Sequence, residues 1–388
     1  MKLTAIDYFT TFAAATIRID RVFETMRTTI LILAAAQALQ PLAPHVKPQP
    51  RYATSGASED PLQAFARSVD AIWSLPGSGP PATRSRMTKE RKEATHATLW
   101  GKREWEQQCS YEHGPLRRYA RVMARSFWSP LMRGLAPTIG VLAAWSVFVF
   151  KKKLTITANG LGFLASPIGL LLAFRVNSCV SRFHTAREMW GQIIFTSRDL
   201  AATLSATAEI ESQTKARCGR LLAAYGWCVK AACNFEEPPA EVLKTLLSEE
   251  DANAVLSARK PALASLALLR KATINLPLAI HVEHSVHHSI TDLNRLFGGI
   301  ERLISTPLAP MFMRHYQRGL LAWLILLPCG LYKAGCSTAP KLAVVVASVA
   351  YLMLGIDEIG LQIKQPFVVM PVHTLAEGLT RDVLAELS

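Results

Sequence analysis

The chain has 388 residues, half of them hydrophobic, and its mean hydropathy is positive, which excludes an ordinary soluble domain and points to a membrane protein. Its formal net charge of +14 fits anionic lipid, nucleic acid or anions, but neither a basic stripe with interleaved aromatic residues nor a zinc-finger spacing accompanies it. We therefore expect no nucleic acid as a partner. The seven cysteines are scattered and include no Cys-x-x-Cys pair, so we expect free, mostly buried thiols rather than a disulfide framework.

Residues 1–95 differ in composition from the rest of the chain. The apolar patch at 26–43 is short for a membrane span, and a Pro/Ser/Thr/Gly-rich stretch that includes residues 75–81 cannot bury enough apolar surface to order itself. The first residues are rich in threonine and alanine and contain several arginines, which favours an organelle-targeting leader. The acidic residues Asp7, Asp20 and Glu24 are atypical of such a leader. We expect a targeting or disordered extension here, with a plain disordered tail as the alternative.

Residues 96–185 are expected to carry the chain into the membrane. Residues 96–130 mix tryptophan and tyrosine with arginine, which predicts a helix at the membrane interface. Residues 131–185 hold two spans. The first is Leu131–Phe150, closed by three lysines; the second apolar run, Gly160–Phe174, is too short to cross alone and must continue as helix through Arg175.

Residues 186–315 read as a soluble helical region, and residues 316–363 as a third and a fourth span. Apolar periodicity predicts soluble helices at 193–210, 221–235, 241–256 and 261–272. The third apolar run is Gly319–Tyr332 and the fourth is Leu342–Ile356, followed by an amphipathic tail over residues 364–388. The expected fold is therefore all-α, with four spans and both termini on one side. The three lysines after the first span then fall opposite the soluble region, against the positive-inside tendency.

A cluster of histidines is the one constellation that favours an enzyme. His281, His284, His287 and His288 recur at helical spacing with Glu283, so one helix face offers imidazoles to zinc or iron. No matching Glu-x-x-His partner occurs elsewhere, and a solvated helix face is the simpler interpretation, with a pH sensor as a lesser one. No Gly-rich phosphate loop and no Ser-His-Asp arrangement is present. We expect no catalytic residue, no metal and no cofactor.

One stretch resembles a known family. It runs Gly169-Leu-Leu-Leu-Ala-Phe-Arg-Val-Asn-Ser-Cys-Val-Ser-Arg-Phe-His-Thr-Ala-Arg-Glu-Met-Trp-Gly191 and resembles the second-span signature of bacterial and plant bestrophins. The resemblance continues in three further motifs, at 197–200, 299–310 and 357–367. It covers roughly residues 105–387, in the family's order.

The resemblance implies a pentameric anion channel whose second span lines a central pore. The family's pore neck consists of three apolar residues four apart, which places it at Ser166, Leu170 and Phe174. Ser166 departs from the usual aliphatic residue, so we expect a wetter and weaker hydrophobic gate at that position.

Five more residues of the same motif are candidates either for attracting anions or for packing. They are Arg175, Asn177, Arg182, Arg187 and Trp190. For the arginines the alternative to anion attraction is an ion pair with Glu188, Glu301 or Glu358.

Two further departures bear on regulation. Animal bestrophins hold calcium with acidic residues soon after the Pro-Phe pair, but residues 367–373 offer no carboxylate, and Lys364 stands where the family usually has an acid. Calcium gating of that type is therefore not expected.

We predict a homopentameric channel in the lipid bilayer for chloride, with bicarbonate or nitrate as further anions. The resemblance to plant members predicts a multi-pass thylakoid protein of the chloroplast; another organelle membrane or the plasma membrane is the alternative. The competing functions are a non-conducting membrane scaffold or regulatory subunit, suggested by Ser166 and Lys364, and a metal-dependent membrane enzyme, suggested by the histidines.

Overall fold

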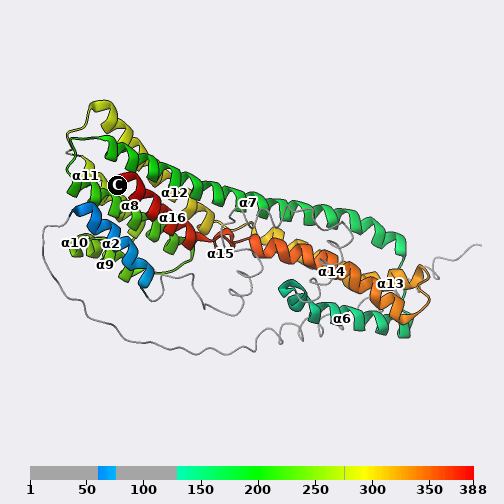
Figure 1. Ribbon diagram of the computed structural model, residues 1–388. Coiled ribbons are helices and arrows are strands. Elements are labelled where there is room, and N and C mark those ends of the chain that lie inside the picture. The colour runs from blue at the N-terminus through cyan, green and yellow to red at the C-terminus, as the bar shows by residue number, and fades with distance from the viewer. Residues whose placement is uncertain (1–59, 76–128, 275) are drawn as a thin grey trace, which may run out of the picture. The chain divides into compact units, whose positions relative to one another are not determined.

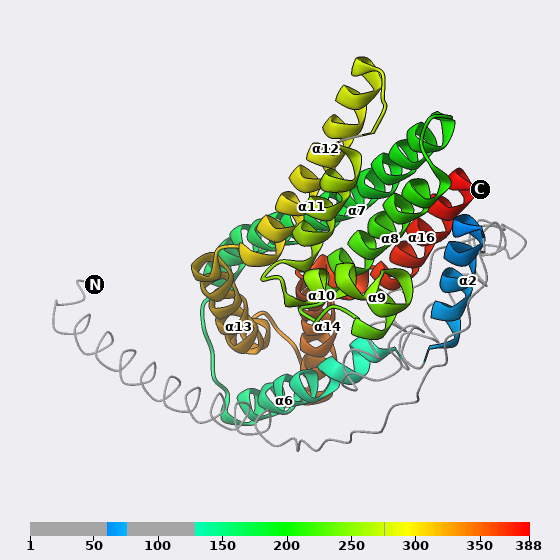
Figure 2. The same cartoon turned by 90° about the vertical axis from the view of Figure 1, so that its left-hand side faces the viewer.

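A computed structural model describes residues 60–75, 129–274 and 276–388, and every regular element within these ranges is an α-helix (Figures 1 and 2). The all-α fold predicted from the sequence is confirmed for these residues. Residues 1–59 and 76–95 of the predicted extension lie outside the described residues, as does the predicted interfacial helix at 96–130 up to position 128.

The four predicted spans fall in four long helices, α6 (Pro130–Lys152), α7 (Ala158–Ala206), α13 (Pro310–Lys333) and α14 (Ala339–Ile363). Among the described helices, α6, α7 and α14 are long and apolar enough to cross a membrane. Helix α13 is not in this group, because its first half carries Arg314, His315 and Arg318 and only its second half matches the predicted third span.

Helix α7 continues without interruption from the apolar run through the arginines, as the short second run requires. It spans 49 residues and therefore crosses the expected boundary between membrane and soluble regions at 185/186. Likewise, α13 begins inside the predicted soluble region, and α14 extends past Asp357 to Ile363.

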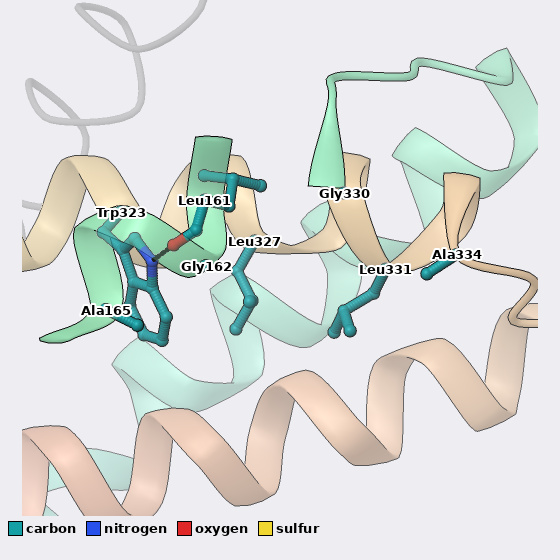
Figure 3. Close-up of a pocket in the computed structure, with 8 residues that line it drawn as sticks. All are labelled: Leu161, Gly162, Ala165, Trp323, Leu327, Gly330, Leu331 and Ala334. Atoms are coloured by element: carbon teal, nitrogen blue, oxygen red, sulfur yellow. Dashed lines mark hydrogen bonds between the residues drawn. The ribbon is translucent and has the colours of Figure 1, made fainter. Parts of the chain in front are cut away.

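Hydrogen bonds from two tryptophan indoles connect the membrane helices. The Trp145 indole of α6 donates to the carbonyl of Ile325 at 2.9 Å, and the Trp323 indole of α13 donates to the carbonyl of Leu161 at 3.0 Å (Figure 3). A cavity of about 190 Å³ lies beside Trp323, with apolar residues from the first turns of α7 and the last turns of α13 around it. Gly360 of α14 lies beside Val176 of α7, where an added Cβ would meet the Val176 side chain at 3.4 Å, an ordinary van der Waals contact.

The soluble region is a bundle around α8 (Ser212–Cys233), which is buried along most of its length. The other members are α9 (Ala240–Leu246), α10 (Glu249–Ser257), α11 (Pro261–Thr273), α12 (Ile280–Ser305), α15 (Pro366–Val369) and α16 (Val372–Leu387). Buried hydrogen bonds tie the bundle together: the Tyr225 hydroxyl donates to the carbonyl of Leu293 at 2.8 Å, and the Trp227 indole donates to Thr380 at 3.2 Å.

The single helix expected at 241–256 is wrong; it is two short helices. The chain leaves α9 at Leu247 in an extended conformation, and Ser248 then begins α10 by accepting a hydrogen bond from the Asp251 amide. A Ser followed three residues later by an acid is a helix-start signal, and the apolar periodicity obscured it.

The structure also differs from the expected extension over residues 1–95. Residues Pro61–Ser74 form α2, in which Phe65, Val69 and Ile72 are buried in the core beside α8, α9 and α16. Asp60 begins the helix by accepting from the Leu62 amide at 3.2 Å. The physical reason is amphipathicity: apolar side chains at three- and four-residue spacing give this short segment one face to bury.

Candidate functional site along helix α7

One face of α7 lies uncovered beside the predicted neck. Ser166, Leu170 and Phe174 are all exposed, the last two by 56 %, although they lie in the most apolar part of the helix. They recur every four residues and so share a face. The described helices that contact α7, namely α8, α12, α13, α14, α15 and α16, leave these three side chains exposed. An apolar face that one copy leaves uncovered is what a pore shared between copies needs.

Pro167 modifies the backbone within this face. Proline has no amide hydrogen, so the carbonyl of Phe163, one turn earlier, loses its partner in the helix. Phe163 is itself 81 % exposed on the same face. A backbone oxygen and the Ser166 hydroxyl therefore make the first turn of the predicted neck more polar than the Leu170 and Phe174 turns.

Arg175 points away from the exposed face. It is 1 % exposed and forms an ion pair with Asp357 of α14. Its guanidinium carbon lies 5.4 Å from the centre of the Tyr316 ring of α13. Arg175 therefore joins three membrane helices, which is the packing role that the sequence left as an alternative to anion attraction.

The remaining residues of the motif divide between packing and exposure. Arg182 is partly buried and donates to the carbonyl of Leu303 in α12, and Trp190 is fully buried in the soluble core. Asn177 is exposed on the face of Phe174, whereas Arg187 is exposed on another side of the helix.

Within one described chain, none of the three candidate acids pairs with an arginine of the motif, and Arg175 pairs with a different acid. Glu301 pairs with Lys260 at 2.9 Å, and Glu358 accepts from the Gln362 amide group at 3.3 Å on its own helix. Glu188 accepts from Gln192 at 3.3 Å. The partner is Asp357, the neighbour of Glu358.

Sequence reasoning missed Asp357 and Tyr316 as parts of this junction. Asp357 follows the apolar run of α14, and an acid within a membrane helix needs a cationic partner, which is the signal that could have identified it. The partner, however, lies 182 positions away in the chain, and no local pattern connects the two.

The histidines do not gather into a metal site among the described residues. They lie on α12, where His287 is 3.8 Å from Glu283 and His288 is 3.4 Å from Asp292. His281 and His284 are exposed. The arrangement matches a polar helix face.

Comparison with known proteins identifies the family. The family model described as "Bacterial/Fungal Bestrophin protein" matches residues 118–385. The chain belongs to this bestrophin family. Helix α2 lies before the matched residues.

Curated relatives include bacterial and plant proteins. The chain is 24 % identical over 245 residues to the "voltage-dependent anion channel-forming protein YneE" of Salmonella typhi, a match that covers 59 % of this chain and 78 % of the relative. It is 22 % identical over 307 residues to "voltage-dependent chloride channel 1, chloroplastic" of Arabidopsis thaliana, covering 74 % and 73 %.

The fold is also that of a solved bestrophin. The chain resembles a mutated bacterial bestrophin homologue from Klebsiella pneumoniae with a TM-score of 0.61 at 22 % identity, over 64 % of this chain and 97 % of that one. At this identity the likeness shows the fold alone.

Proposed function

We propose that the protein is an anion channel in which five copies place α7 around a central pore. Chloride is the principal ion, with bicarbonate or nitrate as further cargo. The observation that carries the proposal is the uncovered face of α7, where Ser166, Leu170 and Phe174 lie exposed within an apolar membrane helix. The names of the bacterial and plant relatives support the same class of function.

The chemistry of this face suits a weakly hydrated anion. Rings of Leu170 and Phe174 side chains make a narrow apolar constriction, which gates by losing water. The edges of aromatic rings carry the positive end of the quadrupole, so Phe174 edges tolerate an anion that passes them. The Ser166 hydroxyl keeps the outermost ring wet and weakens the gate there.

The proposal is tested by recording anion currents in planar bilayers from the wild-type protein and from the Phe174→Ala variant. We expect anion currents from both and a larger conductance in the variant, because the constriction widens. Phe148→Ala is the matched control, since Phe148 is an exposed phenylalanine of α6 away from the predicted neck. Silence of verified pentamers would reject the channel and favour the non-conducting scaffold.

We further propose a thylakoid location. Two Arabidopsis relatives carry the description "chloroplastic", and the arginine-punctuated start of the chain is compatible with import. In that membrane an anion channel dissipates the electrical part of the proton-motive force. A fluorescent tag at the carboxyl end tests the location: signal in mitochondria or at the plasma membrane would contradict it.

A further inference from the structure

The exposed face of α7 continues far beyond the predicted neck. After Phe174 the exposed positions that recur at three- and four-residue spacing are Asn177, Ser181, His184, Glu188, Gln192, Phe195 and Asp199. At 100° per residue, Leu170, Ser181, Glu188 and Asp199 fall within about 40° of Phe174 around the helix axis. The same face that presents the neck therefore presents these side chains in the soluble half of α7.

The full charges on this face are negative. Arg175 is buried against Asp357 and Arg182 is turned to α12, so neither lies on it. Arg187 lies about 100° around the helix from Glu188, with its guanidinium beside Gly191 of its own helix.

Among the residues that the structure describes, neither carboxylate on this face has a cationic partner. Glu188 accepts from the neutral Gln192, and Asp199 makes no ion pair with any described residue.

We propose that Glu188 and Asp199 are the residues that set the discrimination between anions and cations, as two acidic rings below the neck. This rests on the proposed central pore. At 1.5 Å per residue the rings lie about 21 Å and about 38 Å beyond Phe174 along the helix. Five carboxylates facing one passage lower the local concentration of anions and raise that of cations. The apolar neck and the acidic rings thus oppose each other, and their balance limits the anion preference.

The experiment measures the anion-to-cation permeability ratio in planar bilayers under a sodium chloride gradient. Glu188→Gln and Asp199→Asn are recorded singly and together. We expect the ratio to rise by roughly sevenfold for each kT of negative potential that is removed, because a monovalent anion and cation respond in opposite directions. Glu188→Asp keeps the charge and should keep the ratio.

Salt concentration separates a charge effect from a structural one. The increase in the anion-to-cation permeability ratio should be large near 10 mM salt and nearly absent at 1 M salt, since the Debye length falls from about 30 Å to about 3 Å. Glu237→Gln removes one exposed carboxylate from the loop after α8 and should leave the permeability ratio unchanged.

The outcomes distinguish this inference from the channel itself. An unchanged ratio at low salt in the double variant, with normal wild-type currents, would overturn the acidic rings and leave the channel standing. A rise that persists at 1 M salt would also overturn them. Wild-type pentamers without current would reject the proposed function, and the rings with it.

Discussion

Arg175 shows how one buried charge can hold a membrane bundle together. The residue follows directly after Phe174, yet it faces the opposite way, into the junction of α7, α13 and α14. Its ion pair with Asp357 and its contact with the Tyr316 ring compensate the charge of a guanidinium that lipid would leave uncompensated. The exposed Phe174 of the predicted neck and the buried Arg175 are therefore successive residues in different surroundings.

Arg175→Met should destabilise the protein rather than change its ion preference. The variant leaves Asp357 without its partner among the membrane helices, which costs about 3–5 kcal/mol. Arg175→Met combined with Asp357→Leu should recover most of the loss, because both charges are then gone. Thermal unfolding in detergent measures this. A single variant as stable as the wild type, with altered conductance, would show that Arg175 serves the ion instead.

The thiols of α8 provide a pH-dependent contribution to stability. Burial raises the pKa of Cys218, Cys228 and Cys233 to about 12, whereas an unfolded thiol has a pKa of about 8.5. Above pH 9 the unfolded state therefore releases protons that the folded state keeps. Stability from these groups is fully present below pH 8 and is lost as the pH rises towards 12.

Each of the three thiols should cost about 1.4 kcal/mol of unfolding free energy per pH unit above pH 9. Melting temperatures at pH 7.5 and pH 10, for the wild type and a Cys218→Ala, Cys228→Ala, Cys233→Ala variant, measure the effect. The variant should show a smaller drop between the two pH values. Equal drops in both proteins would contradict the assignment.

At the scale of elements, α8 owes its packing to two glycines. A Cβ at Gly219 would lie 2.4 Å from a Leu387 methyl of α16 and 3.0 Å from the Phe65 ring of α2, and a Cβ at Gly226 would lie 3.1 Å from Leu379. Helices α2 and α16 therefore pack closely against α8 because these two positions of α8 have no side chain. Arg220 of α8 reinforces this by donating to the carbonyl of Pro61.

Gly219→Ala should therefore destabilise the soluble bundle by about 1–3 kcal/mol, the range for overpacking a core. Gly378→Ala in α16 is the control, because a Cβ there meets no atom within 4 Å and alanine favours a helix over glycine by about 1 kcal/mol. Unfolding in detergent compares the two variants. Equal stabilities would mean that α2 and α16 can shift apart to accept the methyl group.

Much of this architecture follows from local patterns in the sequence, and the exceptions have physical causes. Apolar runs located the four long membrane helices, and the shortness of the second run required α7 to continue through Arg175. Helix α2 was missed because its amphipathic turns are flanked by residues typical of linkers. The Arg175 partner was missed because it comes from a distant helix, which periodicity cannot specify.

The candidate site was predictable only in part. Family resemblance placed Ser166, Leu170 and Phe174 on one face of the second span, and the structure leaves this face exposed. Which charges share the face depends on the rotation of α7 against α12, α13, α14 and α16. That rotation is set by packing across the whole fold.

At the scale of the whole molecule, the uncovered face of α7 predicts assembly. We expect native mass spectrometry of the detergent-extracted protein to find five copies. Without assembly, exposed apolar residues such as Leu170 would remain uncovered on a helix that also carries exposed polar residues. A monomer that nevertheless conducts would contradict the shared pore.

We infer that this assembly passes anions, and a reversal-potential recording is the decisive test. Purified pentamers are placed in a planar bilayer between unequal concentrations of sodium chloride, with chloride and sodium as the only abundant permeant ions. We expect a current whose reversal potential lies between zero and the chloride equilibrium potential. A reversal at the sodium equilibrium potential, or no current from verified pentamers, would contradict it.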